Sequence, residues 1–326
     1  MNVTVLGAGA WGTALAVVLH QNGHRLTLWG HDAAHLDAMA RTRRNEGFLP
    51  GIELPSDWLY EADPARATAR AELILMVVPS KAFRDVAKRL GVPRCPVVTA
   101  TKGIEFETGR TMGGILEHCL PGVPVAALSG PSLAPEVARG VPTAVVAAAS
   151  DTATAEAVQS AFHRPTFRVY RGSDRLGVEL GGALKNVIAI AAGVCDGLGF
   201  GDNSKAALVT RGQAEVRRLG VACGARAETF SGLSGLGDLT VTCFSRLSRN
   251  RGLGERLGRG ETLAQITAST ASVAEGVPTA RAALRLADEL GVDVPIIREV
   301  HAMLFENKDV RQGVRDLLSR DSKAED

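Results

Sequence analysis

The segment GAGAWG, residues 7–12, is the main evidence for the fold that we predict for this sequence. It follows a short apolar run and opens a helical pattern over 10–22. In this setting Gly7 permits a sharp turn, Gly9 lets the backbone approach a pyrophosphate, and Gly12 lets the helix pack closely on the strand. The N-terminus of the helix offers unpaired N–H groups to an anion. The segment predicts a dinucleotide-binding turn, although a turn needed only for packing has the same composition.

Apolar runs and helical patterns alternate outward from this turn, as far as about residue 170. The runs that we expect to form strands are 3–6, 26–29, 73–78, 97–100, 125–128, 143–148 and 166–170. The helical patterns cover 10–22, 33–42, 81–90, 111–118, 132–139 and 151–163. Apolar strands separated by helices are typical of a parallel sheet covered on both faces. We therefore predict an α/β, Rossmann-like domain over residues 1–172, with a mostly parallel, doubly wound sheet.

The second half of the chain has a different pattern, because the β-branched runs stop after Tyr170. Apolar residues recur every four positions from Leu176 to Ile188, and Pro278 and Gly291 bound another helical pattern. We predict an all-α domain over residues 173–326 that carries the substrate site and packs closely on the first domain.

Composition excludes several classes of function. The 326 residues include 37 Lys plus Arg and 35 Asp plus Glu, a near-neutral balance that argues against a nucleic-acid binder or a polybasic membrane binder. The five cysteines are odd in number and contain no Cys-x-x-Cys pair, which favours a reducing compartment. The seven histidines show no metal-binding pattern. With no apolar run near the roughly 18 residues of a membrane span, we expect a cytoplasmic protein without membrane insertion.

The residues after the second expected strand bear on the choice of cofactor. An acidic residue about 20 positions beyond the glycine turn usually holds the ribose of NAD. Asp32 stands at that spacing, but His31 precedes it, and three arginines follow at positions 41, 43 and 44. A carboxylate would repel a 2′-phosphate, whereas a histidine or arginine would accept one. We expect NADP or NAD, with NADPH preferred.

Lys185 stands in an apolar helical stretch, with Gly181 and Gly182 on the same helical face. Glycine in a helix costs about 1 kcal/mol relative to alanine, so two of them suggest that bulk is excluded there, as it would be beside a ligand. Burial lowers the pKa of a lysine toward the range in which it exchanges protons, as hydride transfer from an alcohol requires. The alternative is a lysine whose stem follows the helix to solvent.

A glycine-rich loop and a polar triplet lie further along, within residues 231–251. Asp238 follows the loop, and Ser248, Arg249 and Asn250 form the triplet. Arginine, serine and asparagine beside free backbone N–H groups suit a phosphate monoester. We interpret the neighbouring arginines as a solvated basic helix face; they are Arg246, Arg251, Arg256 and Arg259.

Two further groups follow expected strands, where open α/β sheets bind ligands. They are Lys102, after the run 97–100, and the segment 129–132, after the run 125–128. A lysine on a surface turn is the alternative for Lys102.

Seven strings resemble those of bacterial NAD(P)-dependent glycerol-3-phosphate dehydrogenase and span nearly the whole chain in order. They are GAGAWGTALA (7–16), NEGFLPG (45–51), TKGIE (101–105), SGPSLAPEVARGVPTAV (129–145), ELGGALKNVIAIAAGVCDGLGFGDNSKAALVTRG (179–212), GLSGLGDLTVTCFSRLSRNR (232–251) and VAEGVPTA (273–280). The resemblance implies reversible reduction of dihydroxyacetone phosphate to sn-glycerol 3-phosphate with NADPH or NADH, for glycerophospholipid synthesis.

The resemblance also implies roles for individual residues. Lys185 would donate a proton in the reduction and accept one in the reverse reaction, and Asn186 would help orient the site. The implied substrate contacts are Lys102, Gly130, Ser132, Lys185, Asp238, Ser248, Arg249 and Asn250. The implied cofactor contacts include the residues of the glycine turn and are Gly7, Gly9, Ala10, Trp11, Gly12, His31, Lys102, Ala134, Arg249, Val273 and Glu275. Ala10 and Leu133 depart from the serine and the aromatic residue that are common in the family.

Two alternatives remain open on the sequence. One is a β-hydroxyacid or 6-phosphogluconate-type dehydrogenase, which the strings GLGDL and SRNR fit poorly. The other is a cofactor-sensing protein without turnover, which would not need Lys185, Asp238 and Arg249. The sequence does not report the oligomeric state, and a homodimer is one assembly that it allows.

Overall fold

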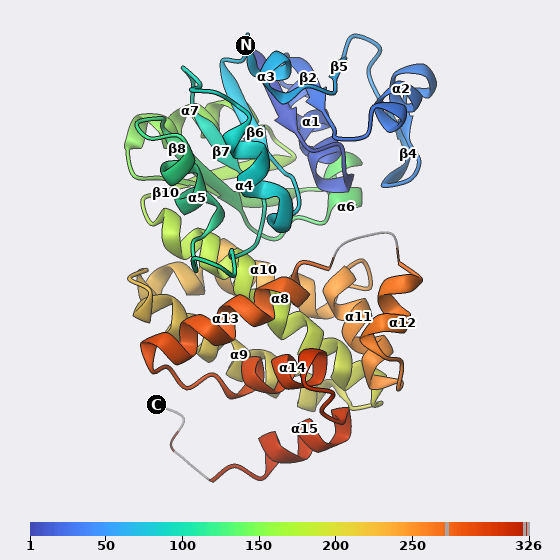
Figure 1. Ribbon diagram of the computed structural model, residues 1–326, viewed down its shortest axis with the longest axis vertical. Helices are drawn as coiled ribbons and strands as arrows, with labels where there is room; N and C mark the ends of the chain where they lie inside the picture. The colour runs from blue at the N-terminus through green and yellow to red at the C-terminus, as the bar shows by residue number, and fades with distance from the viewer. Residues whose placement is uncertain (271–273, 322–323, 325–326) are drawn as a thin grey trace.

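The structure is a computed structural model that describes residues 1–270, 274–321 and 324. Figure 1 shows an α/β part built from the first half of the chain and a helical part built from the second. The last strand ends at Gly172 and the first long helix begins at Arg175, so the change from sheet to helices falls between them.

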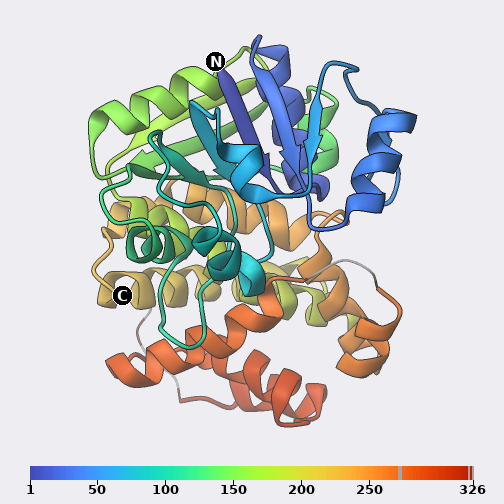
Figure 2. The same ribbon diagram turned by 45° about the horizontal axis from the view of Figure 1, so that its top comes forward.

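The α/β part is built on an eight-stranded sheet in the order β10-β9-β8-β7-β6-β1-β2-β5 (Figure 2). The strands are β1 (Asn2–Leu6), β2 (Arg25–Trp29), β5 (Leu59–Glu61), β6 (Leu73–Met76), β7 (Val97–Thr99), β8 (Val125–Ser129), β9 (Thr143–Ala149) and β10 (Phe167–Gly172). Neighbours from β8 to β5 pair in parallel, whereas β9 is antiparallel to β8 and parallel to β10. The predicted mostly parallel α/β fold is confirmed.

Helices cover both faces of this sheet. They are α1 (Ala10–Gln21), α2 (Ala33–Thr42), α3 (Pro64–Thr68), α4 (Ser80–Lys88), α5 (Met112–Cys119), α6 (Ala134–Ala138) and α7 (Thr152–Phe162). Successive side chains of a strand point to opposite faces. Leu73 and Leu75 of β6 accordingly join the core beneath α1 and α7, while Ile74 and Met76 join the core beneath α4 and α5.

Residues 43–72 hold elements that the sequence pattern did not reveal. A two-stranded antiparallel ribbon forms from β3 (Arg44–Asn45) and β4 (Leu49–Glu53), and β5 and α3 follow it. These elements are two to five residues long, and Pro50 and Gly51 interrupt β4, so they lack the apolar periodicity from which strands and helices are recognised. Asn45 anchors the ribbon from a buried position: its amide donates to the carbonyl of Ala8 at 2.9 Å and to Thr13 Oγ1 at 2.7 Å. It thereby braces the glycine turn.

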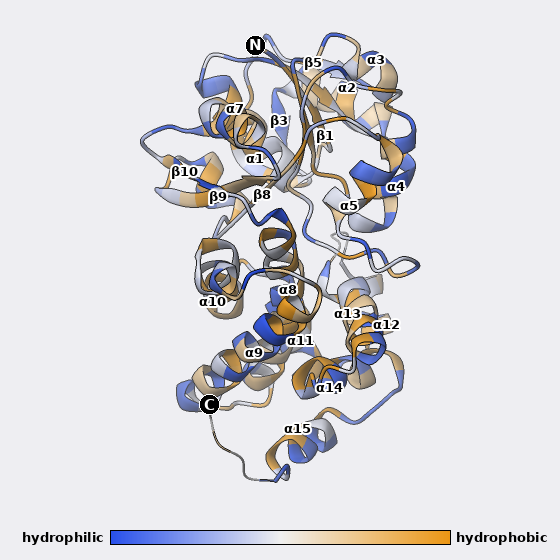
Figure 3. Ribbon diagram, turned by 90° about the vertical axis from the view of Figure 1, so that its left-hand side faces the viewer, coloured by the Kyte–Doolittle hydropathy of each residue, from blue (hydrophilic) through white to orange (hydrophobic). Residues whose placement is uncertain are grey.

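The helical part is built around α8 (Arg175–Gly197), a helix of 23 residues. Around it lie α9 (Asp202–Ala222), the 3-10 helix η1 (Ala227–Ser231), the π-helix η2 (Leu233–Gly237), α10 (Asp238–Phe244), α11 (Arg249–Gly258), α12 (Leu263–Ala268), α13 (Gly276–Leu290), α14 (Pro295–Phe305) and α15 (Val310–Leu318). In Figure 3, α8 lies among α9, α11 and α13, and its buried side chains supply much of the second core.

By length and composition α8 could cross a membrane, with a mean hydropathy of 1.5 over an 18-residue window. The sequence does not show α8 as one apolar run, because charged residues such as Glu179 and Lys185 interrupt it. The whole window is buried inside the protein, and core helices of this composition meet the same criterion.

Several contacts join the α/β part to the helical part away from the glycine turn. Glu179 of α8 accepts from the N–H of Gly113 at the start of α5, at 2.5 Å. Glu275 accepts from the N–H and the hydroxyl of Ser80 at the start of α4, at 3.0 and 2.5 Å. The guanidinium of Arg281 lies 4.7 Å from the ring centre of Phe106. The parts are thus held in contact around the C-terminal ends of the parallel strands.

Candidate active site

Lys185 is buried in the middle of α8, with 6% of its surface exposed. Its ammonium donates to Asp238 Oδ1 and to Thr242 Oγ1, each at 2.6 Å. An ammonium has three N–H donors, so these two bonds leave one donor for a substrate oxygen. The alternative of a lysine whose stem reaches solvent is wrong, because the nitrogen ends among buried partners from α10.

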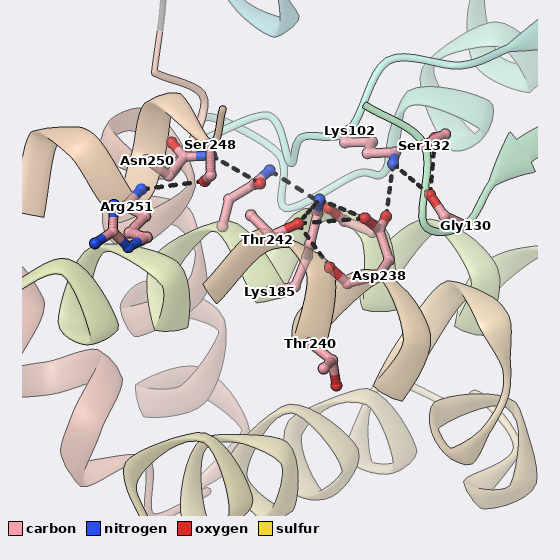
Figure 4. A network of polar contacts seen from close by, with 12 residues as sticks. Lys102, Gly130, Ser132, Lys185, Asp238, Thr240, Thr242, Ser248, Asn250 and Arg251 are labelled. Atoms are coloured by element: carbon pink, nitrogen blue, oxygen red, sulfur yellow. Dashed lines mark hydrogen bonds and ion pairs between the residues drawn. The ribbon is translucent and has the colours of Figure 1, made fainter. Parts of the chain in front are cut away.

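Asp238 is the carboxylate on which two lysines converge (Figure 4). It is 1% exposed, and its second oxygen accepts from Lys102 Nζ at 2.6 Å. Lys102 follows β7, so the Lys102–Asp238 ion pair connects the C-terminal edge of the sheet to α10. The interpretation of Lys102 as a lysine on a surface turn is therefore wrong.

Burial is the main influence on the pKa of Lys185. It lowers the pKa of Lys185 from 10.5 to about 8. The negative charge of Asp238 opposes that shift, and the positive charge of Lys102 adds to it. The ammonium of Lys185 thus has a pKa near neutrality, where a lysine can both donate and accept a proton.

The π-helix η2 brings Asp238 to this place, because it runs directly into α10. Gly235 allows the close packing of η2, since a Cβ at this position would lie 2.1 Å from the carbonyl oxygen of Phe230. One turn into α10, the hydroxyl of Thr242 donates to the carbonyl of Asp238 at 2.6 Å, which directs its oxygen lone pairs to Lys185. Sequence reasoning missed Thr242; its position four residues after Asp238 was the available signal.

The interpretation of Gly181 and Gly182 as space for a ligand is wrong. A Cβ on Gly181 would lie 2.7 Å from the carbonyl oxygen of Ser234, and one on Gly182 would lie 2.5 Å from Ser129 Oγ. These glycines exclude bulk because protein atoms of η2 and β8 already fill the space. Their close packing helps to bring Asp238 within reach of Lys185.

The segment after β8 surrounds the other lysine. Gly130 has a φ of +147°, and a Cβ there would lie 2.9 Å from Val145 Cα, so only glycine fits. The carbonyl of Gly130 accepts from Lys102 Nζ at 3.1 Å and from Ser132 Oγ at 2.8 Å. The hydroxyl of Ser129 is buried and has no hydrogen-bond partner within the described ranges. The structure thus brings Lys102, Gly130 and Ser132 together.

The polar triplet forms the N-terminal end of α11. Ser248 Oγ caps the helix by accepting from the N–H of Arg251 at 3.2 Å. The first-turn N–H groups of Arg249 and Asn250 have no intrahelical acceptor and stay available to an anion. Asn250 is buried and donates to Asn186 Oδ1 at 2.8 Å, next to Lys185 in the chain.

The side chain of Arg249 is exposed, unlike those of its two neighbours. The protein around it nevertheless lowers the pKa of Arg249 by desolvation, while the charge of Glu275 acts in the opposite direction. Arg251, on the same helix, was expected on a solvated basic face, and that expectation is wrong. Only 11% of its side chain is exposed, and its Nε lies 2.6 Å from Asp196 Oδ2.

The glycine turn has the geometry of an anion site. Gly7 has a φ of +132°, and a Cβ on Gly12 would lie 1.9 Å from the carbonyl oxygen of Gly7. The space beside Gly9 is open for 4 Å, and Gly9 caps α1 without a side-chain hydrogen bond. Trp11 lies in the first turn of α1, and its indole nitrogen is buried with no acceptor among the described residues. These residues fit a dinucleotide, with its phosphates at the α1 N-terminus and an acceptor for the indole N–H.

The remaining predicted cofactor residues are spread around the same edge. Ala10 is the first residue of α1, and Ala134 is the first residue of α6. His31 is exposed just beyond β2. Glu275 accepts from Ser80, a contact that the sequence did not reveal. Val273 lies outside the described residues.

Asp32 is the acidic residue at the spacing expected for a ribose contact. Its carboxylate caps α2 instead, accepting from the N–H of His35 at 3.1 Å. Arg43 pairs with Glu53 at 3.0 Å, and Arg44 pairs with Glu46 at 3.3 Å.

Both parts of the chain match models of one family. Residues 2–155 match the N-terminus of NAD-dependent glycerol-3-phosphate dehydrogenase, and residues 174–315 match its C-terminus. The chain belongs to the NAD-dependent glycerol-3-phosphate dehydrogenase family.

Individual members of this family resemble the chain over its full length. A glycerol-3-phosphate dehydrogenase [NAD(P)+] of Citrifermentans bemidjiense is 50% identical over 99% of this chain and 98% of its own. One from Anaeromyxobacter sp. (strain K) is 50% identical over the whole of both chains. The crystal structure of glycerol-3-phosphate dehydrogenase from Coxiella burnetii superposes with a TM-score of 0.95 at 38% identity, covering 98% of this chain and 99% of its own.

Proposed function

We propose that the chain catalyses reversible hydride transfer between NAD(P)H and dihydroxyacetone phosphate, giving sn-glycerol 3-phosphate for glycerophospholipid synthesis in the cytoplasm. The observation that carries the proposal is the cluster in which Lys185 and Lys102 share the buried carboxylate of Asp238. It stands where the helical part meets the edge of the sheet that holds the glycine turn. Family membership supports the same reaction.

Lys185 is the acid in the direction of reduction. When bound, NAD(P)H supplies a hydride to the keto carbon of the substrate. The Lys185 ammonium polarises the carbonyl oxygen and then donates its proton to the forming alkoxide. Asp238 and Thr242 hold the nitrogen in place by accepting its other two N–H groups. In the reverse direction the neutral amine takes the proton back.

Arg249 and the N-terminus of α11 bind the phosphate of the substrate. The guanidinium carries a charge that pairs with a dianion, and the first-turn N–H groups of the helix add donors. Binding of this remote group fixes the keto carbon relative to Lys185, so the phosphate contributes to the rate and not only to affinity. Lys102, Gly130, Ser132 and Asn250 complete the substrate site that we propose.

The cofactor site consists of the glycine turn with Trp11, His31, Ala134 and Glu275. NADPH is the preferred cofactor, because the carboxylate of Asp32, which stands at the spacing expected for a ribose contact, is engaged as a helix cap. His31 is exposed at that position and suits a 2′-phosphate better than a ribose hydroxyl alone.

Initial rates with dihydroxyacetone phosphate, measured with NADPH and NADH side by side, test the proposal. We expect turnover with both cofactors and a higher kcat/KM with NADPH. Rates with 6-phosphogluconate and with β-hydroxyacids test the alternative of a β-hydroxyacid or 6-phosphogluconate-type dehydrogenase. Binding of NADPH without its consumption on any ketone would indicate the cofactor-sensing alternative.

A further inference from the structure

Helices α8 and α11 touch through their backbones. A Cβ on Gly254 of α11 would lie 1.9 Å from the carbonyl oxygen of Ile190, and one on Gly193 of α8 would lie 1.9 Å from that of Arg251. No real Cβ approaches a backbone atom so closely, and backbone atoms cannot rotate aside as a side chain can. Any larger residue at either position therefore has to displace α11 from α8.

Three of the contacts between α8 and α11 join residues that are 64 positions apart in the chain. Asn250 bonds Asn186 across a separation of 64 residues, and the same separation pairs Gly254 with Ile190. It also pairs Gly258 with Val194, whose carbonyl oxygen would lie 2.7 Å from a Cβ on Gly258. Because this separation is constant, the two helices run in the same direction and stay aligned over these positions. The same register sets Arg249, the first residue of α11, level with Lys185 on α8.

A buried ion network holds this register from the side. Asp196 of α8 lies 2.6 Å from Arg251 Nε of α11 and 2.8 Å from Lys205 Nζ of α9. The side chains of these residues are between 8% and 17% exposed. Partly buried ion pairs with several partners resist displacement, because separation would leave charges buried and uncompensated.

We propose that the backbone contact between α8 and α11 is a fixed spacer that sets the distance from Lys185 to Arg249, and so places the phosphate of the substrate relative to its keto carbon. Gly193, Gly254 and Gly258 are then positioning residues for this reaction. The inference rests on the proposed function, since it takes Lys185 and Arg249 as the two ends of one substrate. The partners of Lys185 lie on α10, so a shift of α11 moves Arg249 and leaves the proton donor in place.

The test compares Gly254→Ala with Gly252→Ala in the full-length protein. Gly252 lies on the same helix, and a Cβ there meets nothing within 4 Å, so it is the matched control. KM and kcat are measured with dihydroxyacetone phosphate and with unphosphorylated dihydroxyacetone, which Arg249 cannot hold by charge. We expect Gly254→Ala to lower kcat/KM for the phosphorylated ketone by about 10²-fold, the typical effect of a misplacement near 1 Å. Its slow rate with dihydroxyacetone stays at the native value, and Gly252→Ala changes neither.

Gly258→Ala is the second variant, at a position one turn further along α11. Its Cβ would lie 2.7 Å from a backbone oxygen, compared with 1.9 Å for Gly254→Ala. It therefore keeps the test decisive if Gly254→Ala does not fold. We expect a smaller loss that is again confined to the phosphorylated ketone. A folded Gly254→Ala or Gly258→Ala that matches Gly252→Ala overturns the spacer, and so does an equal loss with both ketones. If the native protein does not reduce dihydroxyacetone phosphate at all, the proposed function itself fails, and the spacer fails with it.

Discussion

At one end of the proposed substrate site Lys185 is buried among partners, and at the other Arg249 is exposed at the start of α11. The lysine has two acceptors at 2.6 Å and a pKa lowered by burial to about 8. A guanidinium keeps its charge throughout the physiological range even where desolvation by the surrounding protein lowers its pKa, as it does for Arg249. The difference suits the two tasks that we propose: the end that can change its charge would move the proton, and the end that cannot would hold the phosphate.

Replacing Lys185 should have the largest effect. Lys185→Ala removes both the proton donor and the charge that stabilises the alkoxide, so we expect turnover of dihydroxyacetone phosphate to fall by at least ~10²-fold. Lys185→Arg is the matched control, because it keeps a cation beside Asp238 but is too weak an acid to donate its proton. It should also be nearly inactive while remaining folded by circular dichroism. Near-native turnover in either variant would remove Lys185 from its role.

Replacing Arg249 should have the next largest effect, and on binding more than on chemistry. Loss of a charged hydrogen bond of about 1.5–3 kcal/mol in Arg249→Ala should raise KM for dihydroxyacetone phosphate by roughly 10- to 10²-fold. Arg249→Lys should recover part of this loss, since it restores the charge but not the planar fork. With unphosphorylated dihydroxyacetone as substrate, the KM of both variants should equal that of the native enzyme. An unchanged KM in Arg249→Ala would place the phosphate elsewhere.

Replacing Thr242 should have the smallest of these effects. Thr242→Val removes one acceptor of Lys185, so we expect kcat to fall by roughly five- to tenfold, the value of one hydrogen bond near 1 kcal/mol. Without this acceptor the ammonium is less stabilised, and the pKa seen in the pH–rate profile should move down. Thr242→Ser keeps the hydroxyl and should restore both kcat and the profile. A valine variant with a native profile would show that the hydroxyl does not hold the amine.

Sequence reasoning reached the fold because its signals are local. The glycine turn and the alternating apolar runs are each contained within a few residues, and they predict the sheet and its helices. The ribbon β3–β4 was not predicted because strands of two and five residues, the longer one interrupted by Pro50 and Gly51, carry no such periodicity. The reversal of β9 and β10 also escaped, since apolar strands have the same composition in either direction.

The site was predictable only as a set of separate residues. Lys185, Lys102 and Asp238 were each singled out, but Lys185 meets Asp238 across 53 residues and Lys102 meets it across 136. No spacing rule reaches so far, because these contacts depend on how the helices pack. The glycines at 181 and 182 were misinterpreted for the same reason: the sequence shows that bulk is excluded but not which atoms exclude it.

The pH dependence of kcat/KM for dihydroxyacetone phosphate reduction tests the central claim most directly. Reduction needs the Lys185 ammonium, so the rate should be flat below its pKa and fall as the pH rises through about 8. The oxidation of glycerol 3-phosphate needs the neutral amine and should rise through the same pH. Measurements above about pH 7 keep the substrate phosphate a dianion throughout. We predict that the reduction rate falls and the oxidation rate rises around one shared midpoint near pH 8. A reduction rate that stays level or increases above pH 8 would contradict the account.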